Sequence, residues 1–293
     1  MDLMQSFILG ALQGITEFLP ISSSGHLILG EQYFQLNTSV LKGFDVTVHM
    51  GTLLAILIYF WHDVWKMIEA FLGLFSGKTK MKDPYAKLIL YIVIGTIPAV
   101  IAGLLFEDWM DENFRNAKAV GTFMILVGIT FYFGEVFYKK HYQSGFKAII
   151  SNAVNKIRDF FRCDRSDEEV QGLNLRKAIV IGCAQAVALL PGVSRSGSTI
   201  VAGLFQGVER SSAARFSFLL GIPAILGAGV LTFIKDGESI ANTVAYSSLG
   251  IGFVTSFIFG LLSISFLMRF LKKYSLNVFA VYLVIIGELT LLT

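Results

Sequence analysis

A short polar stretch interrupts the apolar amino-terminal part of the chain between Gln13 and His26, with the sequence QGITEFLPISSSGH. Gln13 and Glu17 are four positions apart, so a helix would present both side chains on one face. An ionised carboxylate in apolar surroundings requires a polar cavity or a partner. Such a glutamate can accept a proton, or it can hold a divalent cation against a phosphate.

Three serines, Ser22, Ser23 and Ser24, follow a proline that ends the predicted helix. The backbone after the proline is free to turn, so it can expose N–H groups as well as hydroxyls. His26 lies close in sequence to these serines and to Glu17, and these residue types can activate a nucleophile or protonate a leaving group. Serine runs in loops and single buried histidines are also common structural features, so a structural role for His26 stays equally open.

A second polar stretch, residues 185–199, has the sequence QAVALLPGVSRSGST. Arg195 is its most informative residue, because a guanidinium is costly in an apolar segment and is well shaped to bind phosphate oxygens in pairs. A helix that we expect to begin near Ser198 would direct its positive end toward an anion. Further hydroxyl donors belong to Ser194, Ser196 and Thr199. The alternative is an ion pair of Arg195 with Glu17 for stability alone, which would bring the same two residues together.

The composition indicates an integral membrane protein. Of 293 residues, 54% are hydrophobic and only 15% are charged, which is far from the balance of a soluble domain. The net charge of +3 is uninformative as a total, because in a membrane protein the distribution of charge matters more. We expect no nucleic-acid partner. The amino terminus lacks the basic run that precedes a cleavable signal peptide, so we expect no such peptide.

Six apolar segments are predicted to cross the bilayer as helices. Four of them have about 20 residues, enough to span a hydrocarbon core of about 30 Å. The first and the last are shorter and need help from flanking residues. The predicted crossings are residues 46–61, 88–106, 119–138, 216–234, 246–268 and 276–292.

The distribution of Lys and Arg sets the expected topology. Basic residues concentrate in 66–87, 139–177 and 269–273, which we place in the cytoplasm, so that 107–118 and 235–248 lie outside. With six crossings, each of the two polar stretches must enter and leave the membrane on the same side. We therefore expect re-entrant hairpins at residues 1–45 and 178–212.

The predicted fold is an all-α polytopic membrane protein with six transmembrane helices and two re-entrant helical hairpins. Its single membrane domain, residues 1–293, divides into two inverted-topology repeats, 1–138 and 178–293. A likeness between residues 10–13 and 182–185 supports this division, whereas a competing likeness between 95–99 and 221–224 would pair the spans differently. Irregular backbone at membrane depth must be surrounded by protein or water, so the hairpin tips should meet near the midplane.

The connection 139–177 between the repeats is the longest polar stretch. Its apolar residues recur at helical spacing, which predicts an amphipathic helix on the cytoplasmic face. A solvated linker is the alternative and has equal support.

Together, the two motifs resemble those of the undecaprenyl-diphosphate phosphatases of the bacitracin-resistance family. The resemblance covers nearly the whole chain in length, hydropathy and motif order. It implies hydrolysis of undecaprenyl diphosphate, a polyprenyl diphosphate lipid, to undecaprenyl phosphate and phosphate. This reaction recycles the lipid carrier of cell-wall synthesis. The resemblance also implies a location in the bacterial plasma membrane, among membrane lipids, with an active site facing the outside. It further implies dependence on a divalent cation such as Mg²⁺ or Ca²⁺, and it is compatible with a homodimer.

Carried over residue by residue, the resemblance assigns catalysis to Glu17, Ser23, His26 and Arg195, with Glu17 also as a metal ligand. The expected substrate-binding residues are Gln13, Ser22, Ser194, Ser196 and Thr199. Many members have a glutamate at the first motif position, where this chain has Gln13. The neutral carboxamide of Gln13 would then serve as a metal ligand or as a contact to the phosphate. Ser23 is the expected nucleophile, with His26 or water as alternatives.

Two other functions would use similar features. A flippase or transporter that moves a prenyl phosphate lipid without hydrolysis would use the same inverted repeat. A type-2 phosphatidic acid phosphatase is suggested by the Ser-Gly-His sequence that ends at His26. That class requires a later histidine, and no histidine follows His141.

Overall fold

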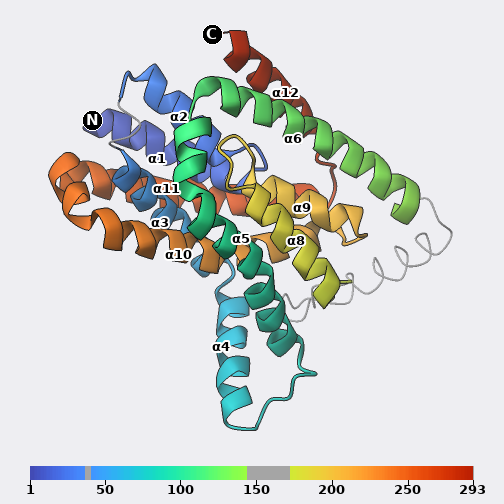
Figure 1. Ribbon diagram of the computed structural model, residues 1–293. Coiled ribbons are helices and arrows are strands. Elements are labelled where there is room, and N and C mark those ends of the chain that lie inside the picture. Colours follow the sequence, from blue (N-terminus) through green and yellow to red (C-terminus); the bar gives the residue numbers. More distant parts are fainter. Residues whose placement is uncertain (37–40, 144–171, 293) are drawn as a thin grey trace.

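The computed structural model describes residues 1–36, 41–143 and 172–292. The first half of the chain contains α1 (Leu3–Phe18), α2 (Ser23–Tyr33), α3 (Lys42–Tyr59), α4 (Trp61–Phe75), α5 (Pro84–Phe114), α6 (Ala117–Tyr138) and a short π-helical segment, η1 (Lys139–Gln143). The second half contains α8 (Leu175–Val187), α9 (Arg195–Phe205), α10 (Arg210–Thr243), α11 (Tyr246–Leu271) and α12 (Asn277–Leu292) (Figure 1). Most of the connection 139–177, with its predicted amphipathic helix, falls outside the described residues.

The all-α multi-pass character is confirmed. Four helices are long and apolar enough to cross a membrane, namely α5, α6, α10 and α11, and α3 with α4 passes the same test as a bent pair. Helix α12 is apolar but shorter. Each predicted crossing coincides with one helix, because the length of an uninterrupted apolar run is a local property that the sequence carries directly.

Helix α4 is not among the predicted elements, because the apolar pattern ends a span near residue 61 and the basic residues of 66–87 favour a loop. The chain instead bends by 78° and continues as a second helix. This helix carries Trp61 and Trp65 on its exposed side and buries Ala70 and Gly73. It projects from the bundle beside the start of α5 (Figure 1).

Both polar stretches form helical hairpins, α1–α2 and α8–α9. A serine hydroxyl starts the second helix of each: Ser22 Oγ accepts the N–H of Gly25, and Ser194 Oγ accepts the N–H of Gly197. Helix α9 therefore begins at Arg195 rather than near Ser198, because the cap forms three residues earlier than expected. Gly192, with φ of 93°, supplies the left-handed backbone that the second turn requires.

The first helix of each hairpin packs against a helix from the other half of the chain: α1 against α11, and α8 against α5. Glycines permit close approach at both contacts. A Cβ atom on Gly10 would lie 2.6 Å from the carbonyl oxygen of Gly252, and one on Gly182 would overlap the carbonyl group of Gly95. Small residues of this kind let helix backbones pack closely in apolar surroundings. The two halves therefore interlock around the hairpins.

A buried ion pair joins α6 and α10, and the residue that precedes α12 also contacts it. Arg210 donates from Nε and Nη2 to the two carboxylate oxygens of Glu135, at 2.9 and 2.6 Å. The backbone N–H of Leu276 donates to the same carboxylate at 2.9 Å. Glu135 is fully buried and all its contacts lie within the bundle, so we assign it a structural role.

Replacing Glu135 with alanine is expected to destabilise the protein by about 3–5 kcal/mol, because a buried guanidinium would lose its partner. The midpoint of thermal unfolding in detergent measures this loss. Glu69→Gln is the control, since Glu69 is exposed and an exposed substitution should change stability by no more than about 0.5 kcal/mol. Equal melting temperatures for the two variants would contradict the structural role of Glu135.

Candidate active site

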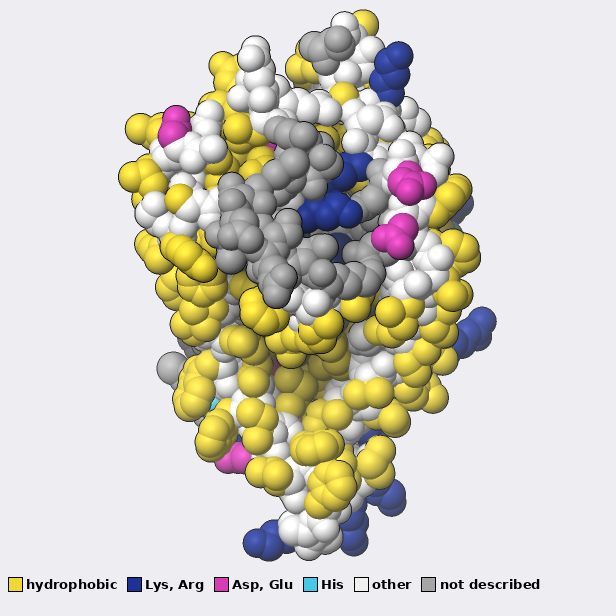
Figure 2. Space-filling model, turned by 60° about the vertical axis from the view of Figure 1, so that its left-hand side comes forward, with side chains coloured by type: hydrophobic (Ala, Val, Ile, Leu, Met, Phe, Trp, Pro, Cys, Tyr) yellow, Lys and Arg dark blue, Asp and Glu magenta, His cyan; other side chains and the backbone are white. Residues whose placement is uncertain are grey.

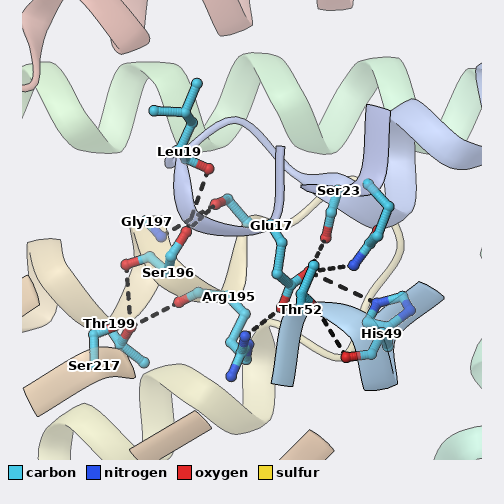
Figure 3. Close-up of polar contacts among 12 residues, drawn as sticks. Glu17, Leu19, Ser23, His49, Thr52, Arg195, Ser196, Gly197, Thr199 and Ser217 are labelled. Carbon is cyan, nitrogen blue, oxygen red and sulfur yellow. Dashed lines mark hydrogen bonds and ion pairs between the residues drawn. The ribbon is translucent and has the colours of Figure 1, made fainter. Parts of the chain in front are cut away.

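The carboxylate of Glu17, at the end of α1, is the centre of the polar site (Figure 3). Its Oε2 accepts hydrogen bonds from Ser23 Oγ at 2.6 Å and from Gln13 Nε2 at 2.9 Å. Arg195 donates from Nη2 to Oε1. The Nε2 atom of His49, on α3, lies 3.7 Å from Oε2. Four side chains from separate helical segments thus converge on one carboxylate.

Arg195 comes from the second hairpin and meets the first at its tip. Its Nη1 atom lies against Gly221 of α10, where a side chain would overlap the guanidinium. Arg195 therefore depends on a glycine for its position, which the sequence motif does not reveal. The pairing of Arg195 with Glu17 that the sequence raised as an alternative is present, and Ser23 and the cavity lie beside it.

Hydroxyls of the second hairpin form a local network around the same contact. Ser196 Oγ lies 3.4 Å from the carbonyl oxygen of Leu19, so a second hydrogen bond joins the hairpin tips (Figure 3). Ser194 Oγ lies 3.3 Å from Ser196 Oγ. Thr199 Oγ1 lies 2.6 Å from Ser217 Oγ of α10. The two hairpin tips are in contact, and in this conformation these hydroxyls bind protein groups.

His26 is held by contacts with Ser22 and Tyr282. Its Nδ1 lies 2.8 Å from the carbonyl oxygen of Ser22, and its Nε2 lies 2.8 Å from the hydroxyl of Tyr282 on α12, with the two rings stacked. A carbonyl can only accept, so Nδ1 carries a proton and a neutral ring accepts the Tyr282 hydroxyl at Nε2. The structure therefore does not bring His26 to the hydroxyl of Ser23.

A cavity of about 310 Å³ opens beside Glu17 and Ser23. Its polar lining comprises Glu17, Ser23, Ser24, Lys42, Asp45, His49, Arg115, Arg195 and Thr232. Its apolar lining includes Leu27, Ile28, Val46, Met50, Leu189, Ala224, Ile225 and Ala228. Lys and Arg side chains gather in a hollow of the face shown in Figure 2, and hydrophobic side chains cover much of the surface below it.

Only some of the motif residues line the cavity. Of the predicted site residues, Glu17, Ser23 and Arg195 line it. The others lie behind this surface or within the hairpins, namely Gln13, Ser22, His26, Ser194, Ser196 and Thr199. Sequence reasoning did not identify Lys42, Asp45 and Arg115, which belong to no motif. The fold brings them to the cavity from the start of α3 and the α5–α6 connection.

One hard oxygen atom near Glu17 is available for a divalent cation. The Oε1 atom of Gln13 is buried and has no hydrogen-bond partner among the described residues. In the same part of the chain, no group of three or more His, Cys, Asp and Glu side chains is arranged to enclose a metal. The residues present fit a cation that shares its coordination with another oxygen-rich molecule, which is how Mg²⁺ is commonly bound.

Comparison with known proteins identifies the family to which this chain is related. Residues 6–289 match the family model described as bacitracin resistance protein BacA. An undecaprenyl-diphosphatase of Methanosphaera stadtmanae is 38% identical over 302 residues, covering 100% of this chain and 98% of the relative. One of Thermodesulfovibrio yellowstonii is 40% identical, covering 96% and 93%. Undecaprenyl-diphosphatase 3 of Bacillus cereus is 36% identical, covering 99% and 97%. The chain therefore belongs to the BacA bacitracin-resistance family.

Proposed function

We propose that the protein hydrolyses undecaprenyl diphosphate to undecaprenyl phosphate and phosphate, and so recycles the lipid carrier of cell-wall synthesis. The observation that carries this proposal is the contact of Ser23 with Glu17 and of Glu17 with Arg195 at the wall of one cavity. This cavity has charged and apolar lining, as an amphiphilic substrate requires. Relatives named undecaprenyl-diphosphatase, matching nearly the whole chain, support the same substrate.

Ser23 is the nucleophile in the proposed reaction. Its hydroxyl is 2.6 Å from Glu17 Oε2, within reach for transfer of its proton to the carboxylate. The oxygen attacks the terminal phosphorus, forming an O–P bond while the bridging P–O bond breaks and undecaprenyl phosphate leaves. Water then cleaves the phosphoserine, which releases phosphate and restores the serine hydroxyl.

Arg195 stabilises the negative charge of the transferring phosphoryl group. Phosphoryl transfer depends mainly on positioning and electrostatic stabilisation, and a guanidinium can donate to two phosphate oxygens at once. Arg195 also holds Glu17 in place through Nη2. The two hairpins must therefore meet before the site is complete.

A divalent cation, Mg²⁺ or Ca²⁺, is part of the proposal. Glu17 and the carboxamide oxygen of Gln13 would hold it. When bound, it would neutralise phosphate charge and polarise a phosphoryl oxygen.

We place this site in six membrane crossings and two re-entrant hairpins, arranged as inverted repeats. The reciprocal packing of α1 on α11 and of α8 on α5 supports this arrangement, because exchanging the two repeats interchanges these contacts. The glycine pairs that include Gly10 and Gly182, the positions aligned in the sequence, support it further. The cavity residues Lys42 and Arg115 lie next to connections expected outside the plasma membrane, which favours an active site facing outward.

Phosphate release from a prenyl diphosphate by the purified protein tests the function. We expect steady release that stops in the presence of a chelator and returns when Mg²⁺ or Ca²⁺ is added. Movement of a labelled prenyl phosphate across vesicles without phosphate release would instead support the flippase alternative, which neither the family model nor the relatives favour. Release that is indifferent to chelator would contradict the cation proposal alone.

A pair of substitutions tests how His26 acts. Asparagine can donate to the Ser22 carbonyl much as Nδ1 does, but it cannot accept a proton. We therefore expect His26→Asn to retain activity within about tenfold, the size of one ordinary hydrogen bond, and His26→Ala to lose more. Equal, severe loss in both variants would show that His26 transfers a proton.

A further inference from the structure

A second ion pair, Arg115 with Asp45, lies in the wall of the active-site cavity. Arg115 Nη2 is 2.6 Å from Asp45 Oδ2 and 4.0 Å from Oε2 of Glu31. The side chains of Arg115 and Asp45 are 18% and 15% exposed, whereas that of Glu31 is fully buried. The pair therefore faces the cavity with a carboxylate behind it.

This ion pair differs from the structural pair formed by Glu135 and Arg210. There, both carboxylate oxygens accept from the guanidinium, and neither residue lines the cavity. At the cavity, the Oδ1 atom of Asp45 is buried and has no hydrogen-bond partner among the described residues, and the same is true of both carboxylate oxygens of Glu31. Asp45 thus keeps a buried oxygen that no guanidinium binds, whereas both oxygens of Glu135 accept from Arg210.

The Arg115–Asp45 pair is connected through α3 to the ion pair formed by Glu17 and Arg195. Asp45 precedes His49 by four residues, which is about 6 Å along a helix axis, and His49 lies 3.7 Å from Glu17. The cavity therefore presents two guanidinium groups, Arg195 and Arg115, whose carboxylate partners lie at opposite ends of a path through His49 and one turn of α3. A diphosphate headgroup has two linked phosphoryl groups that could be bound by two such cations.

The charge of the cavity also favours a second anionic group. Three basic side chains line it, Lys42, Arg115 and Arg195, against two acidic ones, Glu17 and Asp45. Glu17 pairs with Arg195. Lys42 and Arg115 line the α3 side of the cavity together with Asp45.

We propose that Arg115, together with Lys42, binds the second phosphate group of the diphosphate, and that Asp45 holds Arg115 until this phosphate displaces it. The identification of the bound anion as a diphosphate rests on the proposed function. The binding of an anion by Arg115 and Lys42 does not depend on it. Asp45 then competes with the substrate for one guanidinium. Removing the charge of Asp45 and removing that of Arg115 should consequently have opposite effects on binding.

Binding of inorganic pyrophosphate and of inorganic phosphate to the purified protein tests this proposal. In wild-type protein we expect pyrophosphate to bind more tightly than phosphate. Arg115→Gln should weaken pyrophosphate binding by about tenfold or more, the size of one charge-assisted contact, and should remove most of its advantage over phosphate. Asp45→Asn should strengthen pyrophosphate binding severalfold. With a prenyl diphosphate, Arg115→Gln should raise KM and leave kcat nearly unchanged.

Lys118→Gln is the matched control. Lys118 is exposed, has the same charge and lies three residues further along the chain, but it does not line the cavity. We expect Lys118→Gln to bind pyrophosphate and phosphate with the affinities of the wild type. Arg115→Lys keeps the charge without the forked geometry, so it should bind pyrophosphate with intermediate affinity. This variant still tests the proposal if Arg115→Gln does not fold.

The outcomes separate the subsite from the proposed function. Weaker pyrophosphate binding in both Asp45→Asn and Arg115→Gln, or equal affinity of the wild type for pyrophosphate and phosphate, would overturn the subsite and leave a structural cluster. Arg115-dependent pyrophosphate binding in a protein that releases no phosphate from prenyl diphosphates would support the subsite and contradict the hydrolytic function.

Discussion

Replacing Arg195 with alanine is expected to lower phosphate release by about a thousandfold or more, the effect of removing an arginine from a phosphoryl-transfer site. The variant loses the cation that faces the transferring phosphoryl group. It also leaves the buried carboxylate of Glu17 without its guanidinium, which costs about 3–5 kcal/mol of stability. The measurement is the initial rate of phosphate release per folded molecule, with the folded fraction determined by size exclusion in detergent.

Arg210→Ala separates chemistry from stability in this experiment. Arg210 also forms a buried ion pair, but it lies outside the cavity. We expect this variant to melt at a lower temperature and to keep the wild-type rate per folded molecule within a few-fold. An equal loss of rate in both arginine variants would attribute the effect of Arg195 to folding. Full activity of Arg195→Ala would show that the site has been assigned wrongly.

Replacing Ser23 with alanine is expected to reduce activity by at least about a thousandfold, because the remaining electrostatic stabilisation supplies only part of the catalysis once a nucleophile is removed. In wild-type protein quenched with acid during turnover, mass spectrometry should find phosphate covalently bound to Ser23. The same analysis of Ser23→Ala should find no phosphoserine. Because the hydroxyl of Ser23 donates to Glu17, Glu17→Gln should also suppress the trapped intermediate.

Ser24→Ala is the matched control for the nucleophile. Ser24 is the next residue and also lines the cavity, but among the described residues it is Ser23 and Gln13, not Ser24, that donate to Glu17 Oε2. We expect its activity to stay within a few-fold of the wild type. Activity of Ser23→Ala within tenfold of the wild type, together with a severe loss in Arg195→Ala, would indicate direct attack by water.

Much of the fold could be predicted from the sequence because its determinants are local. Apolar runs of sufficient length became helices, and the prolines at positions 20 and 191 interrupt both hairpins where expected. The errors were also local in origin. The start of α9 depended on which serine forms the cap, and α4 depended on a bend between two apolar segments that have no glycine or proline between them.

The sequence by itself determined the class of protein, the family resemblance and three of the residues that line the cavity, Glu17, Ser23 and Arg195. Their types limit the chemistry, because a carboxylate, a hydroxyl and a guanidinium have few common uses in an apolar segment. The sequence could not decide which other motif residues face the cavity. The sequence left a catalytic and a structural role open for His26, and the structure directs its ring to Tyr282, which lies 256 residues further along the chain.

Only the tertiary structure brought Glu17 and Arg195, 178 residues apart, into one ion pair. It also placed Lys42, Asp45, His49 and Arg115 in the same cavity. The physical reason is that side-chain spacing along a helix specifies a face, whereas the neighbour of that face depends on how closely distant helices approach. Here that approach depends on glycines in the helices that contact the hairpins, such as Gly221, whose missing side chain leaves the space for Arg195.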